Sequence, residues 1–285
     1  MPLLVSPVQM LQRGLVAKVR STFNDQSKGQ QPIPRSADAL FAPDSVIWRV
    51  HGDVTSMMVG GISALLLQML HPAALAGVYD HSDVERDQLE RLRRTARFIA
   101  VTTYGERDTA MQAIERVRSI HRQVSGATPA GAAYRADDPA LLAWVHVGGA
   151  LMFLGGWVRY GEPRMTAADR DRYFAESGDV AAMLGADPVP RSEREALALV
   201  SEFRPQLAVD QRTHAFRRLV VDAPVPWREV AAYRLIGAAA LDLLPDFARR
   251  MHGVRAPLAA RPLVRAATAT MAGTLRWAFA AEPYR

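Results

Sequence analysis

Two long stretches without a charged side chain constrain the fold of this 285-residue sequence more than any other feature. They cover residues 54–79 and 141–158, and each contains a single histidine, His71 in the first and His146 in the second. Segments of this length could span a bilayer. Because polar residues and Pro72 interrupt the first stretch, we interpret both as helices buried on all sides in a large helical domain.

Helical periodicity continues outside these two stretches. Residues 8–23 repeat an apolar side chain every four positions, at Leu11, Leu15, Val19 and Phe23. This spacing predicts an amphipathic helix that either docks on the core or lies on a membrane surface. The polar, proline-containing residues 24–38 are typical of a linker.

Capping signals mark further helices. Asp138 before Pro139, Thr166 before Asp169, and Ser192 before Glu195 each predict a helix start. Pro205 and Pro245 are expected to end or kink helices. The two-residue alternation that indicates a sheet is not found. We therefore predict an all-α fold of roughly ten helices, with an N-terminal helix and linker over 1–38 and one domain over 39–285.

Composition excludes several classes of function. The chain has no cysteine, which excludes disulfides, iron–sulfur clusters and a cysteine nucleophile. Its two lysines, Lys18 and Lys28, leave no P-loop and no core lysine for a Schiff base. The net charge of +6 is spread along the chain, so we expect a solvated arginine-rich surface and no nucleic-acid partner. The N-terminus lacks a signal-peptide pattern, so we expect a cytoplasmic protein with membrane association through 8–23 as the alternative.

Histidines are the strong nitrogen ligands that remain. His121 lies on the apolar stripe of a predicted helix, formed with Ala110, Ile114, Val117 and Val124. A histidine in this position either fills the core with a hydrogen bond to a carbonyl or serves as an axial haem ligand. His146, on another apolar helix, is the alternative ligand.

Two further groups could line a ligand site. Arg91 and Thr95 share a helical face with Arg94 adjacent, where they would either form surface salt bridges or bind a buried anion above a cofactor. Gln68 and His71 share a face of a very apolar helix, where they would either bond to backbone near Pro72 or contact a ligand.

Four separated blocks resemble one enzyme family. They read GISALLLQMLHPAALAGVYDHS, ERLRRTARF with TTYG, VRSIHRQVSG, and AAYRADDPALLAWVH. Over residues 45–255 the chain resembles the oxygenases that include the latex-clearing rubber oxygenases and the fungal enzyme that cleaves a farnesyl chain in mycophenolic acid biosynthesis.

The resemblance implies a globin-like helical core that binds haem b without a covalent link. It implies that His121 is the proximal iron ligand and that Arg91, Arg94 and Thr95 line the haem pocket, with Gln68 and His71 as candidates for the distal or substrate wall. Rubber oxygenases carry a distal glutamate, and this chain has Asp80 and His81 in the corresponding region.

We therefore expect an oxidoreductase, a haem-dependent oxygenase that acts on a hydrophobic small molecule with dioxygen. Oxidative cleavage of an isoprenoid double bond is the reaction that the resemblance implies. One alternative is peroxide-driven chemistry with His71 as the acid–base catalyst. Another is a non-enzymatic haem- or lipid-binding helical protein.

Overall fold

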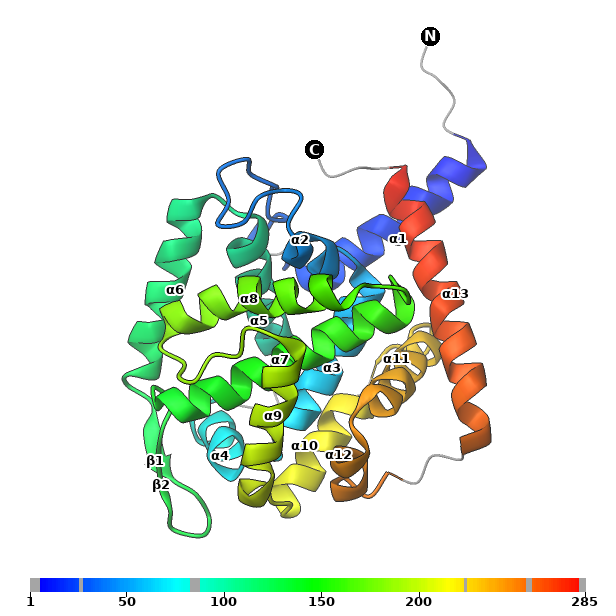
Figure 1. The fold of residues 1–285 in the computed structure, drawn as a ribbon. Coiled ribbons are helices and arrows are strands. Elements are labelled where there is room, and N and C mark those ends of the chain that lie inside the picture. Colours follow the sequence, from blue (N-terminus) through cyan, green and yellow to red (C-terminus); the bar gives the residue numbers. More distant parts are fainter. Residues whose placement is uncertain (1–5, 26–27, 83–87, 223–224, 255–257, 282–285) are drawn as a thin grey trace.

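The computed structural model describes residues 6–25, 28–82, 88–222, 225–254 and 258–281, and helices dominate it (Figure 1). The all-α prediction is confirmed. The described part contains thirteen α-helices: α1 (Pro7–Phe23), α2 (Val46–His51), α3 (Val54–Gln68), α4 (Pro72–His81), α5 (Gln88–Tyr104), α6 (Arg107–His121), α7 (Pro139–Tyr160), α8 (Ala167–Leu184), α9 (Glu193–Phe203), α10 (Gln211–Val221), α11 (Val230–Leu243), α12 (Asp246–Met251) and α13 (Arg261–Ala280).

The two uncharged stretches form the central helix pair, α3 and α7 (Figure 1). Glycine lets their backbones approach closely. A Cβ atom on Gly60 would lie 2.8 Å from the carbonyl oxygen of Met152, and one on Gly156 would lie 2.6 Å from that of Ser56. Contacts this short exclude any larger side chain, so these glycines set the distance between the two helices.

Helices α3 and α7 are surrounded by other helices, as expected for a buried pair. Helices α8 and α9 pack against α7, and α11 and α13 pack against α3. By length and composition alone α7 could span a membrane, and so could α3 with α4 taken together across their 105° bend. Because 56% of the apolar stretch of α7 is buried against the rest of the protein, we interpret it as a core helix.

The remaining helices form two flanks. Helices α1, α11 and α13 pack together on one side of the central pair, whereas α5 and α6 form a hairpin on the other (Figure 1). Among the described residues, α5 and α6 pack mainly on each other and on α1, α2 and α8. The α5–α6 hairpin is therefore not packed tightly along the central pair.

A short hairpin corrects the expectation that no sheet forms. Strands β1 (Ser125–Ala127) and β2 (Ala133–Arg135) pair in antiparallel register after α6. Three-residue strands are too short to show the alternation by which a strand is recognised in sequence. The hairpin follows α6 in sequence and packs on α4, so it links the end of α6 to α4.

The local predictions mostly agree with the structure. Asp138, Thr166 and Ser192 cap α7, α8 and α9, each accepting a hydrogen bond from a backbone N–H of the first turn. Pro205 lies in a 3₁₀ turn (Arg204–Gln206) after α9, and Pro245 precedes α12. The predicted helix 8–23 is α1, and it docks through Gln12 and Val16. The division at residue 38 and the globin-like core stay predictions.

Candidate functional site

His121 is the last residue of α6 and lies where that helix meets the β-hairpin. The predicted stripe is present, because Ala110 and Ile114 are buried and the imidazole of His121 is half-buried. Burial lowers the pKa of His121, only partly offset by the field of Asp137, so the ring is neutral at pH 7. Its Nδ1 is buried and has no hydrogen-bond partner among the described residues. A neutral imidazole in this state is suited to ligate a metal.

The arginines of α5 lie next to the end of α4. Arg91 is half-buried and donates from Nη1 to Ser82 Oγ at 3.4 Å. Burial, and secondarily the charge of Arg94, lowers its pKa to about 10. Neither Arg91 nor Arg94 forms an ion pair within the described ranges, and the nearby Glu90 pairs instead with Lys28 at 3.1 Å. Within these ranges Arg94 does not pair with Glu90, and both interpretations of the two arginines stay predictions.

Arg94 and Thr95 are exposed, whereas the residues that flank them on α5, Arg93 and Ala96, are half-buried. Guanidinium groups with a hydroxyl nearby can bind an anion such as a carboxylate. The buried anion predicted at this helix stays a prediction.

The middle of α7 contains an exposed apolar side chain. Val145 is 36% exposed, whereas Trp144 and Val147 on the same helix are fully buried. Gln68, at the end of α3, donates from Nε2 to the carbonyl oxygen of Val145 at 2.6 Å. The exposure shows that no described helix covers this part of α7, which fits the loose packing of the α5–α6 hairpin along the central pair.

His71 occupies a different environment from the one predicted with Gln68. It is the residue before α4, and its ring lies 6.2 Å from Trp144 and 6.1 Å from Phe203 between centroids. Its Nε2 is 3.4 Å from Oε1 of Gln206. Burial lowers its pKa more strongly than the bond to Gln206 raises it. Neither His71 nor Gln68 uses the backbone near Pro72, so that interpretation was wrong.

His146 also has an unpartnered ring nitrogen among the described residues, as do His71 and His252 at Nδ1. In His146 this nitrogen is Nε2, and it is buried. Burial, with a smaller contribution from Arg191, lowers its pKa to about 4. The alternative iron ligand suggested by the sequence is thus also a neutral histidine with a free ring nitrogen.

Asp80 lies in the region where the resemblance implies a distal acidic residue, and two side chains bind its carboxylate. Its carboxylate accepts from the Tyr134 hydroxyl at 3.0 Å and pairs with Arg212 at 3.3 Å. Burial, helped by this hydrogen bond, raises the pKa of Tyr134 to about 12. Asp80 therefore ties α4 to β2 and α10, and the adjacent His81 contacts the carbonyl oxygen of Ser125 at 3.1 Å.

Sequence reasoning did not single out His51. Its ring nitrogens contact Thr103 Oγ1 at 2.9 Å and the Tyr173 hydroxyl at 3.1 Å, and burial lowers its pKa to about 3. The ring borders a cavity of about 170 Å³ beneath α1, lined by apolar residues that include Phe23 and Met57. Because both of its nitrogens are occupied, His51 is a buried polar link and not a free ligand.

The donor set fits haem better than a bare metal ion. In the described residues no group of three or more histidine, aspartate or glutamate side chains could hold a metal ion directly. Haem brings four equatorial nitrogens and needs one protein ligand, which His121 can provide. Its two propionates need cationic partners, and Arg91 with Arg94 can provide those.

Comparison with curated proteins and with solved structures found no match. The sequence model of one family matches residues 48–277, from α2 to near the end of α13. That span includes every residue discussed above except those of α1 and the loop after it. The chain therefore belongs to the family described as ER-bound oxygenase mpaB/B′/rubber oxygenase, catalytic domain.

Proposed function

We propose that this protein is a haem-dependent oxygenase that acts on a hydrophobic small molecule with dioxygen, an isoprenoid double bond being the target. The observation that carries the proposal is His121, a neutral histidine whose buried Nδ1 has no partner among the described residues. Membership of an oxygenase family makes iron ligation the natural use for such a ring.

The residues of α5 would hold the cofactor. Arg91 and Arg94 would pair with propionates, whose negative charge would oppose the burial and the Arg94 repulsion that now lower the pKa of Arg91. The exposed Thr95 would donate a hydrogen bond at the same wall. When bound, haem would supply the activation of dioxygen that no side chain can perform.

The central pair would supply the apolar wall for the substrate. Val145 offers an exposed aliphatic surface, and Gln68 is fixed beside it by the bond to the Val145 carbonyl. An apolar chain placed there would bury the isopropyl group and exclude water from the reacting bond.

Helix α1 would bring the protein to lipophilic substrates. Val8, Met10 and Leu11 are 54–58% exposed at its N-terminal half, while Gln12 and Val16 face the core. The helix is docked, and its apolar first turns still face outward, as expected of a segment that dips into a lipid interface. The family description includes ER-bound enzymes.

The test is oxygen consumption by the haem-loaded protein with squalene as the probe, alongside detection of carbonyl products. We expect consumption of dioxygen that depends on squalene and yields aldehyde and ketone. Activity that requires hydrogen peroxide instead of dioxygen would favour the peroxide-driven alternative. Haem retention without turnover on squalene and shorter isoprenoids would contradict the isoprenoid substrate class.

Gln68→Leu and Arg116→Gln form a matched pair for that assay. Gln68 touches the proposed substrate wall, whereas Arg116 is exposed on the outer face of α6. We expect Gln68→Leu to change the rate or the product ratio and Arg116→Gln to leave both unchanged. Equal behaviour of the two variants would remove Gln68 from the proposed site.

A further inference from the structure

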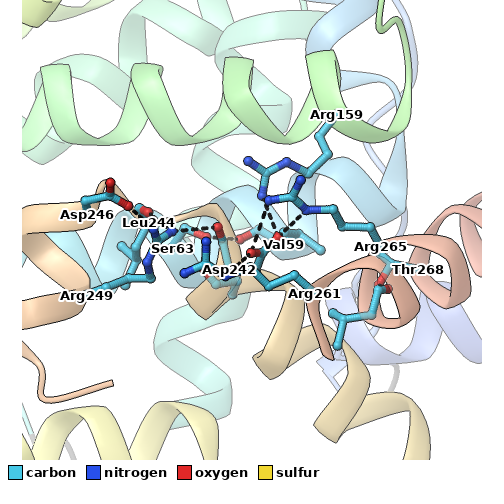
Figure 2. Close-up of polar contacts among 12 residues, drawn as sticks. Val59, Ser63, Arg159, Asp242, Leu244, Asp246, Arg249, Arg261, Arg265 and Thr268 are labelled. Atoms are coloured by element: carbon cyan, nitrogen blue, oxygen red, sulfur yellow. Dashed lines mark hydrogen bonds and ion pairs between the residues drawn. The ribbon is translucent and has the colours of Figure 1, made fainter. Parts of the chain in front are cut away.

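A buried carboxylate surrounded by arginines lies on the other flank of the molecule, among α7, α11 and α13 (Figure 2). Asp242 on α11 has a side chain that is only 5% exposed. Arg265 contacts it through two nitrogens, at 2.7 and 3.2 Å, and Arg159 contacts it through one, at 3.0 Å. Arg261 is a weaker partner, with its Nε 3.4 Å from Oδ1.

The cluster carries more positive charge than its carboxylate can balance. Three guanidinium groups share the single charge of Asp242, which leaves an excess of two. The neighbouring Arg249 pairs with its own partner, Asp246. Burial lowers the pKa of Arg249, and repulsion from the cluster arginines, Arg261 first, lowers it further. The Asp242 carboxylate opposes this effect on Arg249 and raises the pKa of Arg265, so it balances part of the positive charge.

Arg159 and Arg261 each have donors that make no hydrogen bond to a described residue. A guanidinium group has five N–H donors, and Arg159 and Arg261 each direct one nitrogen at Asp242. The Nε of Arg261 is buried and faces Asp242, so its two terminal nitrogens are the donors left for a ligand. The side chains of Arg159 and Arg261 remain 28% and 25% exposed, so the unused donors are within reach of a ligand from solvent.

Helix α13 adds to this potential. It begins at Arg261 without a side-chain cap and without an acidic residue in its first turn. The positive end of its dipole therefore lies beside the arginines and adds to their attraction for an anion.

We propose that Arg159, Arg261 and Arg265 form a binding site for a phosphate-bearing anion, with Asp242 holding the three guanidinium groups in place. Phosphate offers several oxygens to guanidinium groups and can balance the two excess charges. A phospholipid headgroup and a free phosphate compound have this chemistry in common. The site is independent of the proposed haem chemistry, which lies on the opposite flank.

Two binding assays on the full chain distinguish a lipid headgroup from a free phosphate compound as the ligand. The first measures co-sedimentation with phosphatidylcholine vesicles with and without phosphatidic acid. The second measures the shift in melting temperature caused by inorganic phosphate at constant ionic strength. A response to the acidic vesicles alone assigns a lipid headgroup, and a response to inorganic phosphate assigns a free phosphate compound. Both results support the site.

Arg261→Gln is the main variant because it removes the weakest contact to Asp242. It should reduce binding about fivefold, the loss expected for one arginine near an anionic surface. Arg116→Gln, which removes the same charge from the outer face of α6, should leave binding within twofold. Arg265→Lys is the second variant, since it keeps the charge and loses the two-nitrogen contact.

The proposal is overturned if the wild type responds to neither probe. It is overturned equally if Arg116→Gln weakens binding as much as Arg261→Gln, because net charge and not a site would then explain the attraction. Circular dichroism melts of each variant establish that the folded protein is being compared. If Arg261→Gln does not fold, unchanged binding by Arg265→Lys counts against the site.

Discussion

Replacement of Gly156 by alanine tests the close packing of α3 and α7 on which the whole fold depends. The new methyl group would lie 2.6 Å from the carbonyl oxygen of Ser56 and 3.4 Å from the backbone nitrogen of Gly60. Both neighbours are backbone atoms of α3, so no side chain can rotate away. Relief of the contact requires the two helices to separate.

The expected change in the free energy of unfolding of Gly156→Ala is the difference between two opposing effects. Alanine in place of glycine in a helix interior favours the folded state by about 1 kcal/mol. Overpacking of a tight core costs about 1–3 kcal/mol, and a backbone-to-backbone clash belongs at the upper end of that range. The net loss is therefore about 1–2 kcal/mol, which corresponds to roughly 2–8 °C in melting temperature for a protein of this size.

Gly273→Ala is the matched control. Gly273 is also inside a helix, α13, and a Cβ there would meet no atom within 4 Å. The same substitution should raise the melting temperature by about 2 °C, because only the helix propensity changes. Thermal unfolding followed by circular dichroism measures both. If Gly156→Ala is as stable as Gly273→Ala, the backbones are not in contact as described and the reasoning is refuted.

Three further predictions concern charge and acid stability. Because the pKa of buried His51 is about 3 when folded and about 6.5 when unfolded, the unfolded chain binds the extra proton between these values. The contribution of His51 to the free energy of unfolding is complete above pH 6.5 and is lost as the pH falls toward 3. Urea midpoints should therefore fall as the pH is lowered over that range, and should fall less steeply in His51→Gln. Equal dependence of the midpoint on pH in the two proteins would contradict this. Asp242→Asn should lower the free energy of unfolding in urea by about 2–3 kcal/mol. This is less than the loss on breaking a fully buried ion pair, because the side chains of the three arginines are 25–46% exposed. A loss below about 0.5 kcal/mol would show that the arginines are solvated independently of Asp242. Arg91→Gln should weaken haem retention about tenfold in a transfer assay to apomyoglobin, the loss of one charged hydrogen bond; unchanged retention would remove Arg91 from the site.

Local features of this chain could be predicted from sequence, because their causes lie within one turn of helix. The N-caps at Asp138 and Thr166 depend on neighbouring residues, and the stripe that ends at His121 depends on a period of 3.6. The burial of α3 and α7 followed from their lack of charge. Blocks around Arg91 and His121 were enough to indicate the family that the match over residues 48–277 confirmed.

Other features depend on tertiary contacts that no local pattern encodes. The exposure of Val145 arises because α5 and α6 pack elsewhere, although its neighbours on α7 are buried. Helical spacing placed His71 on the same face as Gln68. The helix ends at Gln68, before Pro72, so the two side chains point into different environments. The arginines around Asp242 come from α7 and α13. Arg159 and Arg261 are more than a hundred residues apart in sequence, and only the fold brings them together.

The central claim is that His121 binds the iron of haem. The most direct test is the absorption spectrum of protein produced with a haem precursor, for the wild type, His121→Ala and His146→Ala at equal concentration. We predict a Soret band in the wild type and in His146→Ala, and its loss or a clear shift in His121→Ala. A Soret band that is unchanged in His121→Ala and lost in His146→Ala would assign the iron to His146. Absence of the band from all three proteins, even after reconstitution with haem, would contradict the account.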